Sequence, residues 1–325
     1  LKIDTISPML YIRKKEQKEG RMIRMEKPKK ILVAYDGSPH SKSALDWAIR
    51  LGEDVGAELE LVKVFEPIVR QYTRGDYNIT EKIAAQFAEM EKTDRQMMED
   101  AKHFCEGVCK LKVTVSVLKG NVTSTLLDYA DKSGVDLIVT GTKGHGVLEE
   151  MLVGSVTNKL VSLSKLPILV VKDQHEATKT TLNKIAVAYD GSSYCKAALA
   201  LALDMAKSAK ASVVAVKVID SLEISRIYSK AESGSMTKML EQDPVNQAMI
   251  AEAQAIAAAK GMTLSVELLM GESVTATLLD YVDKNGVNMI VAGTLGHPLL
   301  DQILIGSVTR TLISVSKVPV LVVKK

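Results

Sequence analysis

The feature that most constrains this chain is a glycine-rich segment that occurs twice with the same spacing. Residues 141–156 follow the pattern G-x2-G-x9-G-S, and residues 293–308 repeat it. Each copy lies between an apolar run typical of a buried parallel strand and the apolar periodicity of a helix. Glycines let the backbone approach a ligand closely, and the free N–H groups of a helix N-terminus attract anions. The sequence therefore predicts two phosphate-binding turns, with Ser155 at the N-cap position of the helix after the first turn.

The repetition extends well beyond the glycines. Residues 30–38, Lys-Ile-Leu-Val-Ala-Tyr-Asp-Gly-Ser, return at 184–192 with one substitution, and residues 126–142 match residues 278–294 at 12 of 17 positions. A repeat of this length indicates a duplicated domain rather than a short-period solenoid. We expect four segments: a basic, poorly ordered leader at 1–26, a first domain at 27–173, a linker at 174–182 and a second domain at 183–325.

Within each unit, apolar runs alternate with amphipathic helical patterns, which is typical of an α/β sheet. The strands expected in the first unit are residues 31–35, 58–65, 112–118, 137–140 and 168–171. We predict two Rossmann-like α/β domains, each with a five-stranded parallel sheet flanked by helices. Ligands of such sheets bind at the carboxyl ends of the strands, where the strand order reverses. We therefore expect Asp36, Val64, Gly120 and Gly141 to converge at that edge.

The composition excludes several classes of protein. The chain is 46% hydrophobic but 4% aromatic, so its core must be aliphatic, as in a covered parallel sheet. Residues 1–30 carry ten Lys or Arg and four acids, which leaves a formal charge of −3 on the remainder. That slightly acidic body gives little support to nucleic-acid binding. We expect no membrane span, and three cysteines favour a reducing, cytoplasmic environment over a disulfide framework.

The leader is open to three interpretations: a basic arm, a targeting peptide or a solvated tail. It lacks the continuous apolar region and the small-residue cleavage site of a secretory signal. Its composition favours the solvated tail.

Three segments carry a family resemblance. Tyr-Asp-Gly-Ser after the first strand, Gly-Val-Asp-Leu-Ile-Val-Thr-Gly-Thr at the glycine turn, and Gly-Ser-Val-Thr with its closing Pro-Ile-Leu-Val-Val-Lys are similar to the universal stress protein family. The resemblance covers nearly all of residues 27–325, as a tandem pair. It implies Rossmann-like sheets of the adenine nucleotide alpha hydrolase type. Because both halves keep the glycine pattern, it also implies the ATP-binding subgroup, whose members are cytoplasmic, often dimeric and act in stress adaptation or signalling.

The resemblance also implies a set of site residues that would bind ATP, with or without Mg. The residues of the first half are Ala34, Asp36, Val64, Gly120, Gly141, Lys143, Gly144, Gly154, Ser155 and Val156. Those of the second half are Ala188, Asp190, Val218, Gly271, Gly293, Gly296, Gly306, Ser307 and Val308. We assign no catalytic residue and no metal ligand.

Two groups of residues have a competing interpretation. Asp36 begins Asp-Gly-Ser, which is also typical of an Asx turn or a helix N-cap. Its place at the same sheet edge as the glycine turn favours ligand contact. Cys105 and Cys109 have helical spacing and His103 lies beside them, which suits a metal site, but buried free cysteine in a core is the commoner arrangement.

The two glycine loops differ in residue types that matter to an anion. The first contains Lys143 and Gly146 where the second has Leu295 and Pro298. A lysine adds positive charge for phosphate, although Lys143 has an alternative orientation into solvent. Proline fixes φ and removes one N–H donor. We expect the first site to be the stronger.

An enzyme of the same fold is the alternative to a binding module. Slow ATP hydrolysis or self-phosphorylation at a loop hydroxyl would suit the same nucleotide site. The sequence lacks the G-x4-G-K-[ST] run of a P-loop kinase or motor. A binding module therefore remains the main prediction.

The last strand of each unit would lie at a sheet edge. Residues 168–171 and 320–323 are apolar, and an uncovered apolar edge invites strand pairing. We expect these strands to pair antiparallel within the chain and form an internal pseudo-dimer. The alternative is pairing between two chains in a homodimer.

Overall fold

The computed structural model describes residues 26–66, 77–144, 153–172, 182–228, 236–294 and 305–324, with side chains of the first long helix from residue 85 onward. The expected leader and linker fall almost entirely outside these ranges, so their predicted disorder stays a prediction. Among the described helices, none combines the length and apolar character that a bilayer span requires.

The described residues alternate strands and helices twice over. The first half contains β1 (Lys30–Ala34), α2 (Pro39–Val55), β2 (Glu58–Phe65), α3 (Tyr77–Val108), β3 (Val113–Lys119), α4 (Val122–Ser133), β4 (Leu137–Gly141), α5 (Ser155–Leu163) and β5 (Ile168–Val171). The second half contains β6 (Lys184–Ala188), α6 (Ser193–Ala209), β7 (Ser212–Ile219), α7 (Ser221–Tyr228), α8 (Met236–Gln242), α9 (Pro244–Ala259), β8 (Ser265–Met270), α10 (Val274–Lys284), β9 (Met289–Gly293), α11 (Ser307–Val315) and β10 (Val320–Val323).

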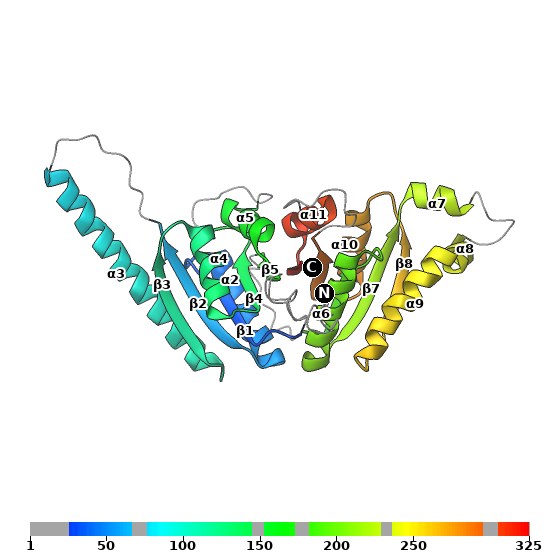
Figure 1. Ribbon diagram of the computed structural model, residues 1–325, viewed down its shortest axis with the longest axis horizontal. Helices are drawn as coiled ribbons and strands as arrows, with labels where there is room; N and C mark the ends of the chain where they lie inside the picture. Colours follow the sequence, from blue (N-terminus) through cyan, green and yellow to red (C-terminus); the bar gives the residue numbers. More distant parts are fainter. Residues whose placement is uncertain are drawn as a thin grey trace, which may run out of the picture.

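The ten strands of the described residues belong to one sheet, in the order β3-β2-β1-β4-β5-β10-β9-β6-β7-β8. Within each half the five strands are parallel, as predicted. The antiparallel junction is β5 with β10, where Val170 lies opposite Val320 and Leu169 opposite Leu321. The two halves therefore lie side by side around this central pair (Figure 1). The expected internal pseudo-dimer is confirmed, and the edge that could have joined two chains is used inside one.

The hydrophobic core forms two layers, one on each face of the sheet, and each layer runs through both halves. One layer is covered by α2, α3, α6 and α9 and contains alternate strand residues such as Val33 and Val187. The other is covered by α4, α5, α10 and α11 and contains Leu32 and Ala186. This alternation follows from the period of two along a strand, which sends successive side chains to opposite faces. Burial of continuous aliphatic layers is the main term that holds the halves together.

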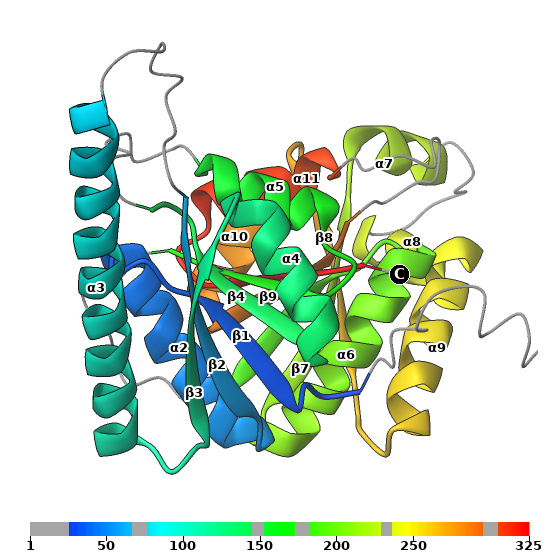
Figure 2. The same ribbon diagram turned by 60° about the vertical axis from the view of Figure 1, so that its left-hand side comes forward.

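The halves differ most between their second and third strands. The first half has one long helix there, α3, which extends past the sheet at its start (Figures 1 and 2). The second half has three helices there, α7, α8 and α9. A small apolar cluster of Ile219, Ile227 and Leu240 fixes α7 and α8 at the end of the sheet.

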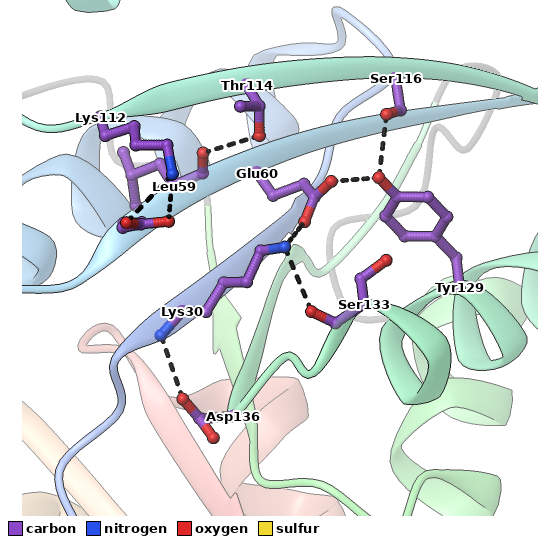
Figure 3. Close-up of polar contacts among 10 residues, drawn as sticks. Lys30, Leu59, Glu60, Lys112, Thr114, Ser116, Tyr129, Ser133 and Asp136 are labelled. Carbon is purple, nitrogen blue, oxygen red and sulfur yellow. Dashed lines mark hydrogen bonds and ion pairs between the residues drawn. The ribbon is translucent and has the colours of Figure 1, made fainter.

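One acidic side chain is buried within the first half. Glu60 on β2 is 5% exposed, and its Oε2 lies 2.6 Å from Nζ of Lys30 on β1. Its other oxygen accepts a hydrogen bond from the hydroxyl of Tyr129 on α4, which also contacts Ser116 on β3 (Figure 3). The Lys30 ammonium also donates to the Ser133 carbonyl. Hydrogen bonding to Glu60 raises the pKa of Lys30 despite its partial burial.

Two lysines cross from one half to the other at the junction. Lys172, directly after β5, donates to the carbonyl of Ser314 in α11 at 3.5 Å. Lys324, directly after β10, donates to the carbonyl of Ser162 in α5 at 2.5 Å. Each ammonium therefore lies at the C-terminal turn of a helix of the other half, where the helix dipole favours a cation. Burial lowers the pKa of Lys324 to about 8.

The stability of the protein should depend on Lys324 above neutral pH. An unfolded lysine keeps its proton up to about pH 10.4, whereas Lys324 in the folded chain loses its proton near pH 8. Between these values the unfolded chain binds more protons, so the lysine contributes stability that rises with pH. We expect the Tm of wild type minus that of Lys324→Met to become more positive from about pH 7 to about pH 9.5. Parallel Tm curves would contradict the assignment.

Candidate functional sites at the carboxyl ends of the strands

Asp36 follows β1 and forms the tight turn that the Asx-turn interpretation of Asp-Gly-Ser predicts. Its Oδ1 accepts hydrogen bonds from the Ser38 N–H at 3.0 Å and from the Ser38 hydroxyl at 2.6 Å. Ser38 in turn caps α2 by accepting from the Ser41 N–H. Gly37 between them has φ +80°, a conformation that favours glycine. One carboxylate oxygen of Asp36 is thus committed to the turn.

The other oxygen of Asp36 faces the glycine loop. A Cβ placed on Gly144 would lie 2.7 Å from Asp36 Oδ2, so any larger residue at 144 would collide with the carboxylate. Asp36 therefore serves the turn with one oxygen and approaches the loop with the other. The expected convergence of the loop with the end of β1 holds for this pair, and the two interpretations of Asp36 are compatible.

Gly141 has a structural role that the sequence analysis did not predict. A Cβ at Gly141 would lie 2.7–2.8 Å from the backbone and Cβ of His40, in the first turn of α2. The equivalent Gly293 meets Tyr194 and Cys195 of α6 at 2.8–3.1 Å. These two glycines let a helix pack closely on the end of a strand. Their side of the sheet is the α2 and α6 face, opposite the face covered by α5 and α11.

The helix after the loop begins one residue earlier than predicted. Gly154, not Ser155, is the N-cap of α5, and Ser155 is the first helical residue. The reason is a backbone hydrogen bond of 2.7 Å from the Gly154 N–H to the Thr142 carbonyl, which closes the loop at its base. A second anchor is Thr157, whose hydroxyl donates to the Gly141 carbonyl at 2.7 Å.

The N-terminus of α5 differs from those of five other helices in how it is capped. Those five begin after a side chain that accepts a hydrogen bond from the first turn, namely Ser38, Asn121, Ser192, Asp243 or Ser273. Gly154 and Gly306, which precede α5 and α11, have no side chain to do this. The first N–H groups of α5 and α11 thus have no capping side chain at the N-cap, and such a helix N-terminus favours an anion.

Lys143 and Thr142 lie at the base of the first loop and are both buried. Lys143 is 8% exposed, so the alternative in which it extends into solvent is wrong. Thr142 is 4% exposed, and its hydroxyl has no hydrogen-bond partner within the described part of the chain. The sequence analysis did not assign Thr142 to the site. The available signal was the recurrence of Gly-Thr in both loops, as Thr142 and Thr294.

The remaining predicted residues are small or apolar, and they lie near the ends of strands or in the first turn of α5 and α11. Side chains at six of these positions are packed on the α4, α5, α10 and α11 face, namely Ala34, Val64, Val156, Ala188, Val218 and Val308. Any ligand contact from them must come largely from main-chain atoms. Gly120 and Gly271 follow β3 and β8, and a Cβ there would collide with Thr125 or Thr277. The next helix thus sets the need for glycine at both positions.

The second half repeats this frame. Asp190 Oδ1 accepts from the Ser192 N–H at 2.9 Å, and Gly306 donates to the Thr294 carbonyl at 2.7 Å. Thr309 donates to the Gly293 carbonyl at 2.7 Å, as Thr157 does to Gly141. Several predicted or compared loop residues lie outside the described residues: Gly146, Leu295, Gly296 and Pro298.

The cysteine group of α3 does not form a metal site. Cys105 is fully buried in the core, and burial raises its pKa to about 12. His103 is exposed and lies 3.4 Å from Glu106. Over the described ranges, no three His, Cys, Asp or Glu side chains are close enough to hold a metal ion. The core interpretation of Cys105 is confirmed.

Comparison with known proteins agrees with the repeated architecture. The model of the universal stress protein family matches residues 27–172 and again residues 181–324. A universal stress protein of Mycolicibacterium smegmatis is 27% identical over 299 residues, covering 90% of this chain and 96% of the relative. A Bacillus subtilis universal stress protein is 33% identical over 148 residues, covering 44% of this chain and 98% of the relative. Among solved structures, a universal stress protein from Archaeoglobus fulgidus superposes with a TM-score of 0.65 at 18% identity, covering 91% of this chain and 98% of that one.

Proposed function

The chain belongs to the universal stress protein family, as a tandem member, and we propose that it binds ATP at the glycine loop of each half. Within this proposal the two domains are residues 27–173 and 183–325, joined by a linker at 174–182. Nucleotide occupancy would make the protein a module of stress adaptation or signalling.

The observation that carries the proposal is the meeting of Asp36 with the glycine loop beside a helix that lacks a side-chain cap. Asp36 Oδ2 faces Gly144, and α5 begins at Ser155 without a capping side chain. A carboxylate can accept hydrogen bonds from ribose hydroxyls, while uncapped N–H groups and the helix dipole favour phosphate. A nucleotide presents both kinds of group. Glycine at 144 and 154 keeps the loop backbone close to both features, since a Cβ at 154 would crowd the Thr142 carbonyl.

The direct test is to identify by mass any nucleotide that co-purifies with the full chain and to titrate the nucleotide-free protein with ATP by calorimetry, with and without Mg. We expect up to two ATP molecules per chain. Release of phosphate measured in the same samples separates a binding module from a slow ATPase. Failure to bind ATP at millimolar concentration would contradict the proposal.

The two sites should differ in affinity, with the Lys143 site the tighter. A charge-assisted contact from a lysine to phosphate contributes about 1.5–3 kcal/mol, which corresponds to about tenfold to a hundredfold in Kd. Lys143 is buried at the base of its loop, and Leu295 occupies the equivalent position. Calorimetry of the wild type should show two classes of site, and Lys143→Leu should weaken the tighter class toward the other.

Lys159→Leu is the matched control for that substitution. Lys159 lies on α5, the helix that follows the first glycine loop, and its side chain is exposed. Its replacement removes the same charge and should leave both affinities nearly unchanged, because exposed charges act weakly. Equal affinities in the wild type, or a Lys143→Leu protein that titrates as the wild type does, would contradict the predicted difference.

A further inference from the structure

Three buried threonines lie close together at the end of β4, and they differ in whether the hydroxyl has a partner. Thr140 is 5% exposed and its hydroxyl donates to the Gly141 carbonyl at 3.2 Å. Thr157 is 3% exposed and donates to the same carbonyl at 2.7 Å. Thr142 is 4% exposed, yet its hydroxyl has no partner within the described residues. A buried hydroxyl without a hydrogen bond is destabilising and calls for an explanation.

The backbone of Thr142 is held firmly, so the position of its side chain is set by the fold. Its N–H donates to the Val171 carbonyl at 2.9 Å, and its carbonyl accepts from Gly154 at 2.7 Å. Thr142 therefore touches both the end of β5 and the N-cap of α5. Thr142 directly follows β4, and the alternation of that strand, continued by one residue, puts it on the same face as Ile138, which α4 and α5 cover.

Two residues next to Thr142 suit an anion. Gly154 begins α5 without a side-chain cap. Lys143, the next residue, is buried in the same loop base. A hydroxyl can donate one hydrogen bond, and the backbone of Thr142 lies against the N-cap of α5, at the positive end of its helix dipole. An acceptor with negative charge would satisfy both the hydroxyl and the helix N-terminus.

We propose that the Thr142 hydroxyl is a further ligand contact, which donates a hydrogen bond to a phosphate oxygen of the nucleotide at the N-terminus of α5. This inference rests on the proposed nucleotide binding. It goes beyond the glycine pattern because it names one side chain that donates to the phosphate, and not to the base or the ribose.

Thr142→Val tests the inference because it removes the hydroxyl and keeps the shape. If the hydroxyl is unpaired without ligand, the variant should be as stable as the wild type or more stable in the absence of nucleotide. Its affinity for ATP should fall about tenfold at one site, as for loss of a hydrogen bond to a charged group. Affinity for adenosine, which lacks phosphate, should not change. Thr142→Ser, which keeps a hydroxyl at this position, should bind ATP about as tightly as the wild type does.

Thr157→Val is the matched control for stability. It makes the same chemical change in the same loop base but removes a hydroxyl that has a partner, so the free protein should lose stability. Opposite signs for the two variants would support the inference. A Thr142→Val protein that loses stability as Thr157→Val does, or that binds ATP as tightly as the wild type, would overturn it.

The same titrations separate this inference from the proposed function. If the wild type binds ATP and Thr142→Val binds it with the same affinity, the role of Thr142 is overturned and the proposed nucleotide binding stands. Equal losses of adenosine and ATP affinity in Thr142→Val overturn the assignment to phosphate. Wild-type protein that binds neither ATP nor inorganic triphosphate overturns both proposals.

Discussion

Proline in place of Val170 or Val322 should separate the two halves of the protein. Both residues are at most 2% exposed and belong to the central antiparallel pair, β5 with β10. We expect each substitution to lower the free energy of unfolding by at least about 1–3 kcal/mol, because proline removes an N–H from a central ladder and leaves a buried carbonyl without its donor, and its ring clashes with neighbouring backbone. Urea unfolding followed by fluorescence and by circular dichroism measures the change.

The hydrogen-bond pattern explains the choice of these two positions. The carbonyls of Pro167 and Val171 accept from β4, so by alternation Val170 directs its backbone groups to β10. On β10, the carbonyls of Pro319 and Val323 accept from β9, so Val322 faces β5 in the same way. Proline at either position therefore removes a bond between the halves and leaves each five-stranded unit paired within itself.

Ser265→Pro is the control for the general effect of proline in a strand. Ser265 is exposed and is the first residue of β8, an edge strand of the sheet, so proline there removes at most the terminal bond of the ladder to β7. It should change stability far less than Val170→Pro. We also expect the two central variants to unfold in separate transitions, one for each half. A single transition at the wild-type midpoint would show that the pairing of β5 with β10 contributes little to the stability of the contact between the halves.

The fold could be predicted largely from the sequence because its signals are repeated and strongly apolar. Strands β2, β5 and β10 span the predicted residues, since continuous Val, Ile and Leu runs admit few alternatives. The α7 and α8 helices were not predicted, because short helices of seven or eight residues give a weak periodic signal. They form because Ile219 and Leu240, distant in the sequence, bury against each other.

The candidate site was predictable in outline and not in its hydrogen bonds. Asp36 and Gly144 each follow a predicted strand closely, so both were expected at the edge where the carboxyl ends of parallel strands meet. The cap of α5 could not be read from the sequence, because Gly-Ser fits either residue at the N-cap. The bond from Gly154 to Thr142 decides it, and that bond depends on the closed loop.

The burial of Glu60 is a case where the sequence pattern misleads. Glu58 and Glu60 alternate with leucine on β2, which suggests a solvated face. Glu58 follows that expectation and forms an exposed pair with Lys112. Glu60 is covered because Tyr129 of α4 and Lys30 of β1 both reach it (Figure 3). The tertiary contacts, not the strand pattern, decide which of the two acids is buried.

The second half also has an acidic residue near the tyrosine of the equivalent helix, but this residue lies on another strand. The ladder places Val214 where the first half has Glu60, since these residues pair with Ala186 and Leu32 respectively. It also places Glu267 of β8 where the first half has Ser116 of β3. Burial, and then Glu267, raise the pKa of Tyr281, and Lys184 lies 5.9 Å from the centre of that ring.

Replacement of Glu60 by valine should therefore destabilise the first half although the second half carries valine there. The substitution leaves Lys30 and the Tyr129 hydroxyl without their buried acceptor. We expect a loss of roughly 2–3 kcal/mol in the free energy of unfolding, near the low end for removal of one partner from a buried ion pair. The loss stays at that end because the Lys30 side chain is 28% exposed and keeps the Ser133 carbonyl. Glu58→Gln, which breaks an exposed pair on the same strand, should cost at most about 0.5 kcal/mol.

The sharper test adds a second substitution that copies the other half. In Glu60→Val with Ser116→Glu, the carboxylate moves to β3, which is the position that Glu267 occupies on β8. From there it can again accept from Tyr129, because Ser116 and the Tyr129 hydroxyl are 3.0 Å apart. We expect the double variant to recover at least half of the stability lost by Glu60→Val, whereas Ser116→Glu by itself should destabilise by placing two carboxylates around one tyrosine. A double variant that is no more stable than the sum of its single changes would show that the two halves do not share this arrangement.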